Sequence, residues 1–410
     1  MKHKIDSNYI QSIFIKYAEV ESNSVEDAGK VPSSEGQIVL GKIIIEDLKK
    51  LGVTDVEQDS NGYVVARVKG NTKAPTIAFI AHLDTYHSTN GKNVKPIVHK
   101  NYDGKSIILP KEGTVIKVED FPELKEKVGK TLITSSGDTL LGGDDKCGIA
   151  ICMETAKFLI EDKEFKHGDV CFVFAPDEEI GHGASLLDLK KLNAVGAYTL
   201  DSEGHSTITN ETFCANFMTV TITGRDIHPG YAKDKMVSAI RVAATFVEKL
   251  PTDKRPETTE GRQGFIHPVK VDASVTEAKI GCLLRDFKVE GLTVLEDIAR
   301  GIADEVSTKY KGAEIKIETK AQYRNMRYEL DKDPRIVEYA QEAMKNCGIN
   351  PQFSQARGGT DGSQLSYRGL LTPDLPVGYY AFHSKCEWVC LEEMLQTADI
   401  IKEMIHVWTK

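Results

Sequence analysis

Apolar positions in the first two hundred residues predict strands that alternate with helices. Nearly continuous apolar runs at residues 76–85 and 169–176 predict buried strands, and a third run at 194–202 ends in polar residues. Residues 36–52 and 149–159 instead carry apolar side chains at helical spacing. This alternation is typical of an α/β layer in which helices pack on a mixed, mostly parallel sheet. We therefore predict an α/β fold.

The pattern changes at about residue 217, where strand and helix signals follow in the order β-α-β-β-α-β. That order is typical of a ferredoxin-like α+β domain. The expected elements are strands at residues 218–223, 268–275, 278–285 and 314–319 and helices at residues 236–250 and 295–306.

Near the C-terminus, the pattern of the first two hundred residues returns. Asp333 is expected to cap a helix, with Pro334 at its first position and Gly348 at its end. Another amphipathic helix is predicted at residues 391–408. The expected domains are residues 1–212 (main domain, first part), 213–322 (inserted domain) and 323–410 (main domain, second part).

Composition narrows the functional classes. The 410 residues are 40% apolar and 28% charged, which excludes collagen-like and strongly disordered chains. The formal net charge of −9 disfavours nucleic acid and anionic membranes as partners. We see neither a signal-peptide pattern nor a membrane-length apolar run, and the eight cysteines form no CxxC pair. We therefore expect a cytoplasmic protein with reduced thiols.

Polar side chains stand where the predicted strands end or glycine turns begin. His82 and Asp84, at the end of one strand, lie on the same side of it, although a polar strand end would look the same. Asp144 and Asp145 follow two glycines and precede a helix. One aspartate could cap that helix, but two adjacent carboxylates exceed what a cap needs.

Three further segments carry similar groups. Asp177, Glu178 and Glu179 follow a buried strand, either as a cation-binding cluster or as an acidic solvated loop. Asp201 ends the next strand, and His383 follows an apolar run near the C-terminus. The carboxyl ends of strands in an open α/β sheet form its ligand crevice. Together, these histidines and carboxylates suit Zn²⁺, Mn²⁺ or Co²⁺.

Several longer segments resemble a known family. They are VPSSEGQ, HLDT, GKNVKP, TLITSSGDTLLGGDDKCGIA, FAPDEEIGHGA, IHPGYAKDKMVSA, LLRDF, ARGGTDGSQLS and FHSKCEWV. From about Val31 to the C-terminus the chain resembles the peptidase T family of cytosolic tripeptide aminopeptidases. This family belongs to a clan of two-zinc peptidases that includes carboxypeptidase G and aminoacylase. The resemblance implies a zinc-peptidase-like catalytic domain with an inserted ferredoxin-like lid.

The resemblance also implies two metal positions that share one carboxylate. His82, Asp144 and Asp201 would hold one divalent ion, and Asp144, Glu179 and His383 the other. Zinc is the expected metal, with manganese and cobalt as alternatives.

Two further catalytic roles follow from the same resemblance. Glu178 would act as general base toward a water nucleophile, and Asp84 would orient His82. A cis peptide bond is implied after Asp144. The expected reaction is hydrolysis of the N-terminal peptide bond of a tripeptide.

The resemblance assigns three further residues to substrate binding, two in the inserted domain and one, Arg357, in the second part of the main domain. His228 would stabilise the oxyanion, and Arg285 and Arg357 would receive the C-terminal carboxylate of the peptide, unless these arginines form structural salt bridges. The resemblance also suggests a homodimer that forms through the inserted domain.

Other functions stay open at this stage. The alternatives are a related metal-dependent dipeptidase, a carboxypeptidase, an N-acyl amino acid amidohydrolase and a non-catalytic peptide-binding protein. Glu203, His205 and Cys386 depart from the family pattern close to the expected metals, and the sequence assigns them no role.

Overall fold

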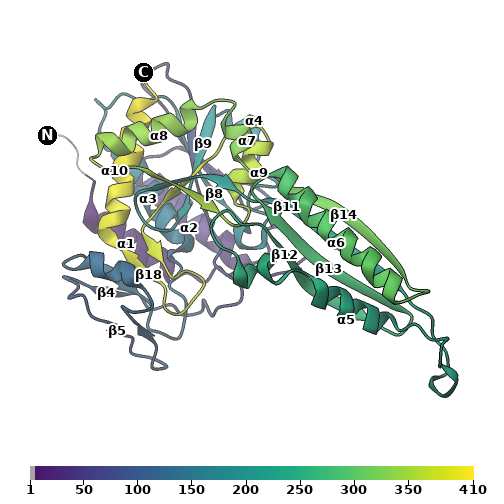
Figure 1. The fold of residues 1–410 in the computed structure, drawn as a ribbon. Helices are drawn as coiled ribbons and strands as arrows, with labels where there is room; N and C mark the ends of the chain where they lie inside the picture. Colours follow the sequence, from purple (N-terminus) through teal and green to yellow (C-terminus); the bar gives the residue numbers. More distant parts are fainter. Residues whose placement is uncertain (1–4) are drawn as a thin grey trace. The chain divides into compact units, whose positions relative to one another are not determined.

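The computed structural model describes residues 5–410, which form two compact units (Figure 1). Unit 1 contains the chain up to Asn210 together with Glu329–Ser354 and Gln364–Lys410. Unit 2 contains Glu211–Tyr328 and Gln355–Ser363.

The core of unit 1 is a mixed sheet. In spatial order its eight strands are β1 (Asp55–Gln58), β2 (Val64–Val68), β8 (Val170–Ala175), β3 (Ile77–His82), β9 (Gly196–Ser202), β16 (Asp374–Pro376), β10 (Thr207–Thr212) and β15 (Gln352–Ala356). The central strands β8, β3, β9 and β16 are parallel, whereas β2 and β10 pair antiparallel with their neighbours β8 and β16. The predicted α/β class with a mixed, mostly parallel sheet is therefore confirmed.

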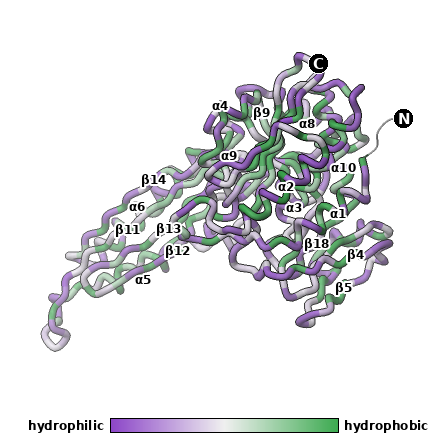
Figure 2. Tube along the Cα trace, turned by 180° about the vertical axis from the view of Figure 1, so that it is seen from behind, coloured by the Kyte–Doolittle hydropathy of each residue, from purple (hydrophilic) through white to green (hydrophobic). Residues whose placement is uncertain are grey.

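Both faces of this sheet are covered, so β3 and β8 are buried along their whole length and are mostly apolar (Figure 2). Ala78 and Ile80 of β3 pack on one face with Leu187 and Leu192, while Phe79 stacks on Tyr198. The helices of unit 1 are α1 (Ser7–Ala18), α2 (Glu35–Leu51), α3 (Gly143–Glu161), α4 (Leu189–Leu192), α8 (Arg335–Asn346) and α10 (Leu391–Val407). Two short helices, α7 (Arg327–Leu330) and α9 (Asp361–Tyr367), lie at the changes between units.

Short strands form two small sheets that the sequence did not predict. One has the order β17 (Tyr379–Tyr380), β18 (Trp388–Cys390), β7 (Leu132–Thr134) and β4 (Ile97–His99), and the other pairs β5 (Ile107–Ile108) with β6 (Val115–Ile116). Segments of two or three residues are too short to show a periodic pattern.

Unit 2 has the predicted β-α-β-β-α-β order. Its elements are β11 (Cys214–Thr223), α5 (Ala239–Lys249), β12 (Phe265–Ala273), β13 (Glu277–Asp286), α6 (Val289–Lys309) and β14 (Glu314–Tyr323). The antiparallel sheet has the order β12-β13-β11-β14, and α5 and α6 bury a continuous apolar core against it.

Some expected boundaries differ from those in the structure. Helix α8 begins at Arg335, one residue later than expected, and the Asp333 carboxylate accepts a hydrogen bond from the backbone N–H of Arg335. Residues 355–363 belong to unit 2 rather than to the second part of the main domain, because the Arg357 guanidinium donates to the carbonyls of Gly261 and Gln263. The functional division into a catalytic and a lid domain stays a prediction. Among the described residues, no helix combines the length and apolarity that a membrane span needs.

A buried ion pair ties helix α10 to the segment before β7. Lys127 and Glu393 are each about 1% exposed, and the Lys127 ammonium lies 2.5 Å from the carboxylate. The Tyr380 hydroxyl donates to the second oxygen of Glu393, 2.8 Å away. The charge of Glu393 is thus fully compensated within unit 1.

We expect Lys127→Met to lower the free energy of unfolding by about 1.5 to 3 kcal/mol, because Glu393 loses its shortest charged hydrogen bond and keeps only Lys130, 3.4 Å away, as a lysine partner. Denaturant titration measures this loss. The matched control, Lys249→Met, removes a surface ion pair with Glu305 and should cost less than about 1 kcal/mol. Equal losses in the two variants would contradict this account of the pair.

Candidate metal centre

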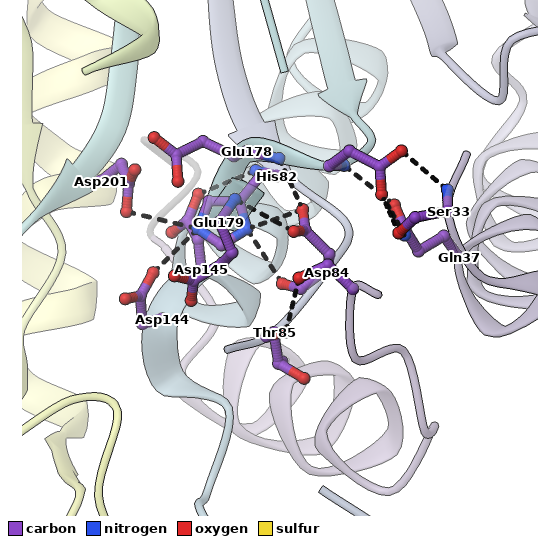
Figure 3. Close-up of polar contacts among 12 residues, drawn as sticks. Ser33, Gln37, His82, Asp84, Thr85, Asp144, Asp145, Glu178, Glu179 and Asp201 are labelled. Carbon is purple, nitrogen blue, oxygen red and sulfur yellow. Dashed lines mark hydrogen bonds and ion pairs between the residues drawn. The ribbon is translucent and has the colours of Figure 1, made fainter. Parts of the chain in front are cut away.

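Three parallel strands bring the candidate residues to one edge of the sheet. β3 ends at His82, and β8, paired with it, leads into the short helix η2 (Glu178–Ile180). Strand β9 lies on the other side of β3 and carries Asp201 near its end. Figure 3 shows the carboxylates of Asp201 and Glu179 beside His82.

A tight turn before α3 supplies the central carboxylate. Gly142 has a φ of +79°, a conformation that suits glycine, and Asp144 has non-helical backbone angles. The peptide bond between Asp144 and Asp145 is cis, as the resemblance implied. The buried Glu387 carboxylate holds this turn, since it accepts hydrogen bonds from the backbone N–H groups of Leu141, Gly142 and Asp144 at 2.7 to 3.0 Å.

The side chain of Asp144 lies between the two histidines. Its Oδ1 is 2.8 Å from Nε2 of His82, and its Oδ2 is 3.1 Å from Nε2 of His383. His82 Nε2 is also 3.6 Å from Asp201, and His383 Nε2 is 2.8 Å from Glu179. The structure thus brings the five expected ligands together, in two groups that share Asp144.

Asp145, His82 and Asp201 also have ligand atoms close enough to one another to hold a metal ion. The oxygens of Asp145, however, already accept from backbone donors: Oδ2 from the N–H of His82 at 3.1 Å and Oδ1 from the N–H of Gly148 at 3.0 Å. The second bond caps the first turn of α3. The two adjacent aspartates therefore have different functions, because Asp145 caps the helix while Asp144 faces the histidines.

Asp84 connects His82 to the acidic turn. Its two carboxylate oxygens accept from the backbone N–H groups of Glu178 and Glu179 at 3.0 and 3.1 Å. Nδ1 of His82 is 2.9 Å from the Asp84 carbonyl oxygen and 3.4 Å from the carboxylate. Asp84 is thus placed to fix both the histidine ring and the turn that carries Glu178.

Several observations fit this cluster to divalent metal ions. Glu179 Oε1 is buried without a hydrogen-bond partner, so it has an unused lone pair. Imidazole nitrogens and carboxylate oxygens, without thiolates, are donors that zinc, manganese and cobalt accept. The carboxylates crowd one buried edge and repel one another unless cations compensate them.

Protons compensate part of this charge when no metal is present. Burial and the charge of Asp144 raise the pKa of Glu179 to about 7. Burial lowers the pKa of His383, but its contacts with Asp144 and Glu179 outweigh this and raise it to about 10. Burial also lowers the pKa of His82, but the neighbouring carboxylates outweigh this effect and raise it above its ordinary value.

The sequence analysis missed residues that hold His383. The ring of Tyr86 stacks on the imidazole at a centroid distance of 4.0 Å, and the Thr89 hydroxyl donates to the His383 carbonyl. On the other side of the cluster, the Tyr379 hydroxyl donates to Asp201 at 3.1 Å. Both tyrosines lie next to motif residues, but nothing in their spacing distinguishes them from core aromatics.

The three predicted substrate-binding residues lie in unit 2. His228 is exposed at the start of a short turn, and its Nδ1 accepts from the N–H of Gly230. Arg285 is buried, and its guanidinium donates to the carbonyls of Asn216 and Leu284.

Arg357 also has contacts within unit 2, where its guanidinium lies over the ring of Phe213 at 5.1 Å. The structure shows these backbone and ring contacts for the two arginines, and their role in binding a peptide carboxylate stays a prediction.

The residues without an assigned role have different surroundings. Glu203 is exposed, and His205 lies 3.2 Å from Glu393 of the buried ion pair. Cys386 packs against an apolar cluster around Trp388, with its sulfur 3.9 Å from the Val115 carbonyl oxygen. This packing is typical of a structural thiol.

Metal binding should release protons at pH 8. A histidine with its ordinary pKa of about 6.5 is already neutral there, whereas His383 still holds a proton that a metal must displace. Affinity should therefore rise with pH between about 6 and 9. Calorimetric titration of chelator-treated protein in buffers of different ionisation enthalpy measures the release, and His383→Gln should reduce it. An enthalpy that does not depend on the buffer would contradict the prediction.

Comparison with known proteins gives close sequence relatives. A protein named Peptidase T from Clostridium novyi (strain NT) is 42% identical over 400 residues, covering 97% of this chain and 98% of the relative. Another with the same name, from Geobacillus kaustophilus (strain HTA426), is 42% identical over 398 residues, covering 96% and 97%.

Solved structures share the fold. Aminopeptidase PepT from Bacillus cereus ATCC 10987 has a TM-score of 0.77 at 23% identity, with 99% of this chain and 100% of that chain covered. A dinuclear metal-binding peptidase of the M20 family from Bacillus subtilis has a TM-score of 0.66 at 16% identity, with 97% of each chain covered. The sequence profile of peptidase family M20/M25/M40 matches residues 141–407. The chain belongs to this peptidase family.

Proposed function

We propose that this protein is a metal-dependent aminopeptidase that hydrolyses the N-terminal peptide bond of tripeptides. The name Peptidase T of relatives about 42% identical over the full length supports the reaction class. The observation that carries the proposal is the position of Asp144, whose two oxygens face the imidazoles of His82 and His383.

Two groups of residues would hold the metal ions. His82 and Asp201 would hold one ion, Glu179 and His383 the other, and Asp144 both. When bound, a pair of divalent ions acidifies water and polarises a carbonyl group. We propose zinc as the metal, because nitrogen and oxygen donors at a buried peptidase site suit it, with manganese and cobalt as alternatives.

Glu178 is the proposed general base. It lies in the turn next to Glu179, and its backbone N–H is fixed by the Asp84 carboxylate. Its half-buried carboxylate would take the proton of the attacking water and pass it to the leaving amine.

Related hydrolytic reactions differ from this one in the substrate. Cleavage of a dipeptide, of a C-terminal residue or of an N-acyl amino acid would use the same centre. The roles of His228, Arg285 and Arg357 in substrate binding stay predictions, as do a homodimer, a cytoplasmic location and a function in peptide breakdown.

Glu178→Gln should lower kcat by about 10² to 10⁴, because it removes the proton acceptor. Metal content, measured by atomic emission, should not change, since Glu178 is outside both ligand groups. Glu35→Gln, an exposed glutamate at the start of α2, is the control and should keep full activity. A Glu178→Gln enzyme with near-normal kcat would exclude this residue as the base.

Substrate preference tests the proposed reaction. With metal added back after chelation, we expect cleavage of trialanine and much slower cleavage of dialanine, tetra-alanine and N-acetyl-trialanine, measured by release of free alanine. Rapid cleavage of the blocked peptide would assign the protein to N-acyl hydrolysis instead. If no peptide were cleaved with zinc, manganese or cobalt, a non-catalytic peptide-binding role would replace the proposed function.

A further inference from the structure

The segment VPSSEGQ, singled out in the sequence, has no part in the metal centre. We propose that Ser33 and Gln37 of this segment are positioning residues that fix the turn of Asp177, Glu178 and Glu179. This inference rests on the proposed function, because it assigns these side chains to the geometry of the general base.

The backbone N–H and the carboxylate of Asp177 are held by Ser33 and Gln37 of this segment, while its carbonyl accepts a hydrogen bond from the N–H of His182. Gln37 makes two hydrogen bonds with it: its Oε1 accepts from the backbone N–H at 3.0 Å, and its Nε2 donates to Oδ1 at 2.6 Å. The backbone N–H of Ser33 donates to Oδ2 at 2.7 Å, and its hydroxyl donates to Oδ1. Both the main chain and the side chain of Asp177 are therefore fixed.

Because these groups are buried, the loss of their hydrogen bonds would destabilise the turn. Gln37 and Asp177 are fully buried, and Ser33 is 5% exposed. A buried carboxylate without donors costs several kcal/mol. Asp177 also has a φ of +59°, in the left-handed region that non-glycine residues adopt only when their surroundings impose it. The network supplies that constraint at the residue directly before the base.

The position of Gln37 in α2 indicates a specific function. It lies on the buried face of the helix, with Leu40, Gly41, Ile44 and Leu48 following at helical spacing. An apolar side chain at this position would serve packing alone. A glutamine suits this position because its amide offers an acceptor and a donor on separate atoms, Oε1 for the Asp177 N–H and Nε2 for its carboxylate.

The acidic turn is therefore held from two sides. Asp84 accepts the N–H groups of Glu178 and Glu179, and Gln37 and Ser33 hold Asp177. If the second set of bonds were lost, the backbone at Glu178 and Glu179 could rotate away from the metal centre. Their carboxylates would then lie in less productive positions.

The test uses Gln37→Glu, which places a carboxylate oxygen against Oδ1 of Asp177. We expect kcat for trialanine to fall about 10- to 100-fold with KM changed less than about threefold, as for other residues that orient ligands. Calorimetry on metal-free protein should show weaker binding of one of the two ions, because Glu179 moves with the turn. The double variant Gln37→Glu/Asp177→Asn restores the donor and acceptor pair and should recover most of kcat.

The control is Asp47→Asn on the same helix, whose carboxylate contacts Lys16, Lys50 and Tyr17 rather than the turn. It should lower thermal stability without lowering kcat. If Gln37→Glu lost stability but kept kcat and metal affinity, Gln37 would be merely structural and the inference overturned. Lack of recovery in the double variant would also count against it.

Should Gln37→Glu fail to fold, Ser33→Ala removes a single hydroxyl and should lower kcat in the same direction, whereas unchanged kcat and metal affinity would contradict the inference. Failure of the proposed function is distinguishable, because wild-type protein would then cleave no tripeptide. In that case the metal affinity of Gln37→Glu still decides whether this segment positions the turn.

Discussion

Mutual repulsion among buried carboxylates is the interaction around which the catalytic edge of unit 1 is built. Asp84, Asp144, Asp145, Glu179 and Asp201 converge on His82 and His383 at the ends of neighbouring strands. No folded chain keeps so many negative charges together without compensation. The surrounding structure supplies that compensation in two different forms.

Backbone N–H groups compensate one set of carboxylates. Asp84 accepts two of them, Asp145 two, Glu387 three and Asp177 one. The Asp177 carboxylate also accepts from the Ser33 hydroxyl and the Gln37 side-chain amide, while its own N–H donates to Gln37. These groups hold loops in place and have little capacity left for a cation.

Asp144, Glu179 and Asp201 face imidazole nitrogens instead. Their charge is compensated by protons on the histidines or by metal ions that replace those protons. This distinction separates ligands from supporting groups more clearly than distance does, since Asp144 and Asp145 are adjacent and both lie close to His82. It also explains why cations are expected at the carboxylates that face the imidazoles and not at those that accept backbone N–H groups.

Much of the fold could be predicted from periodicity. The buried strands β3 and β8 and the β-α-β-β-α-β order of unit 2 have strong patterns, because their apolar faces are long and continuous. The short strands around Trp388 gave no signal, since two or three residues have no period.

The site was predictable only in part. Strand ends and glycine turns pointed to Asp144 and Asp201, and resemblance to a family supplied the pairing of ligands. Spacing could not tell Asp144 from Asp145, because which of them caps the helix depends on the three-dimensional turn. Gln37 did leave a signal, as a polar residue on the apolar face of a helical pattern, but its partner Asp177 lies 140 residues away in the chain.

The central claim is that Asp144 bridges two metal ions, and crystallography of the zinc-loaded protein with data on both sides of the zinc absorption edge tests it most directly. The account predicts two anomalous peaks per chain, one beside His82 and Asp201 and one beside Glu179 and His383, with an oxygen of Asp144 bound to each. A single peak, or a metal bound through Asp145 while Asp144 binds none, would contradict it.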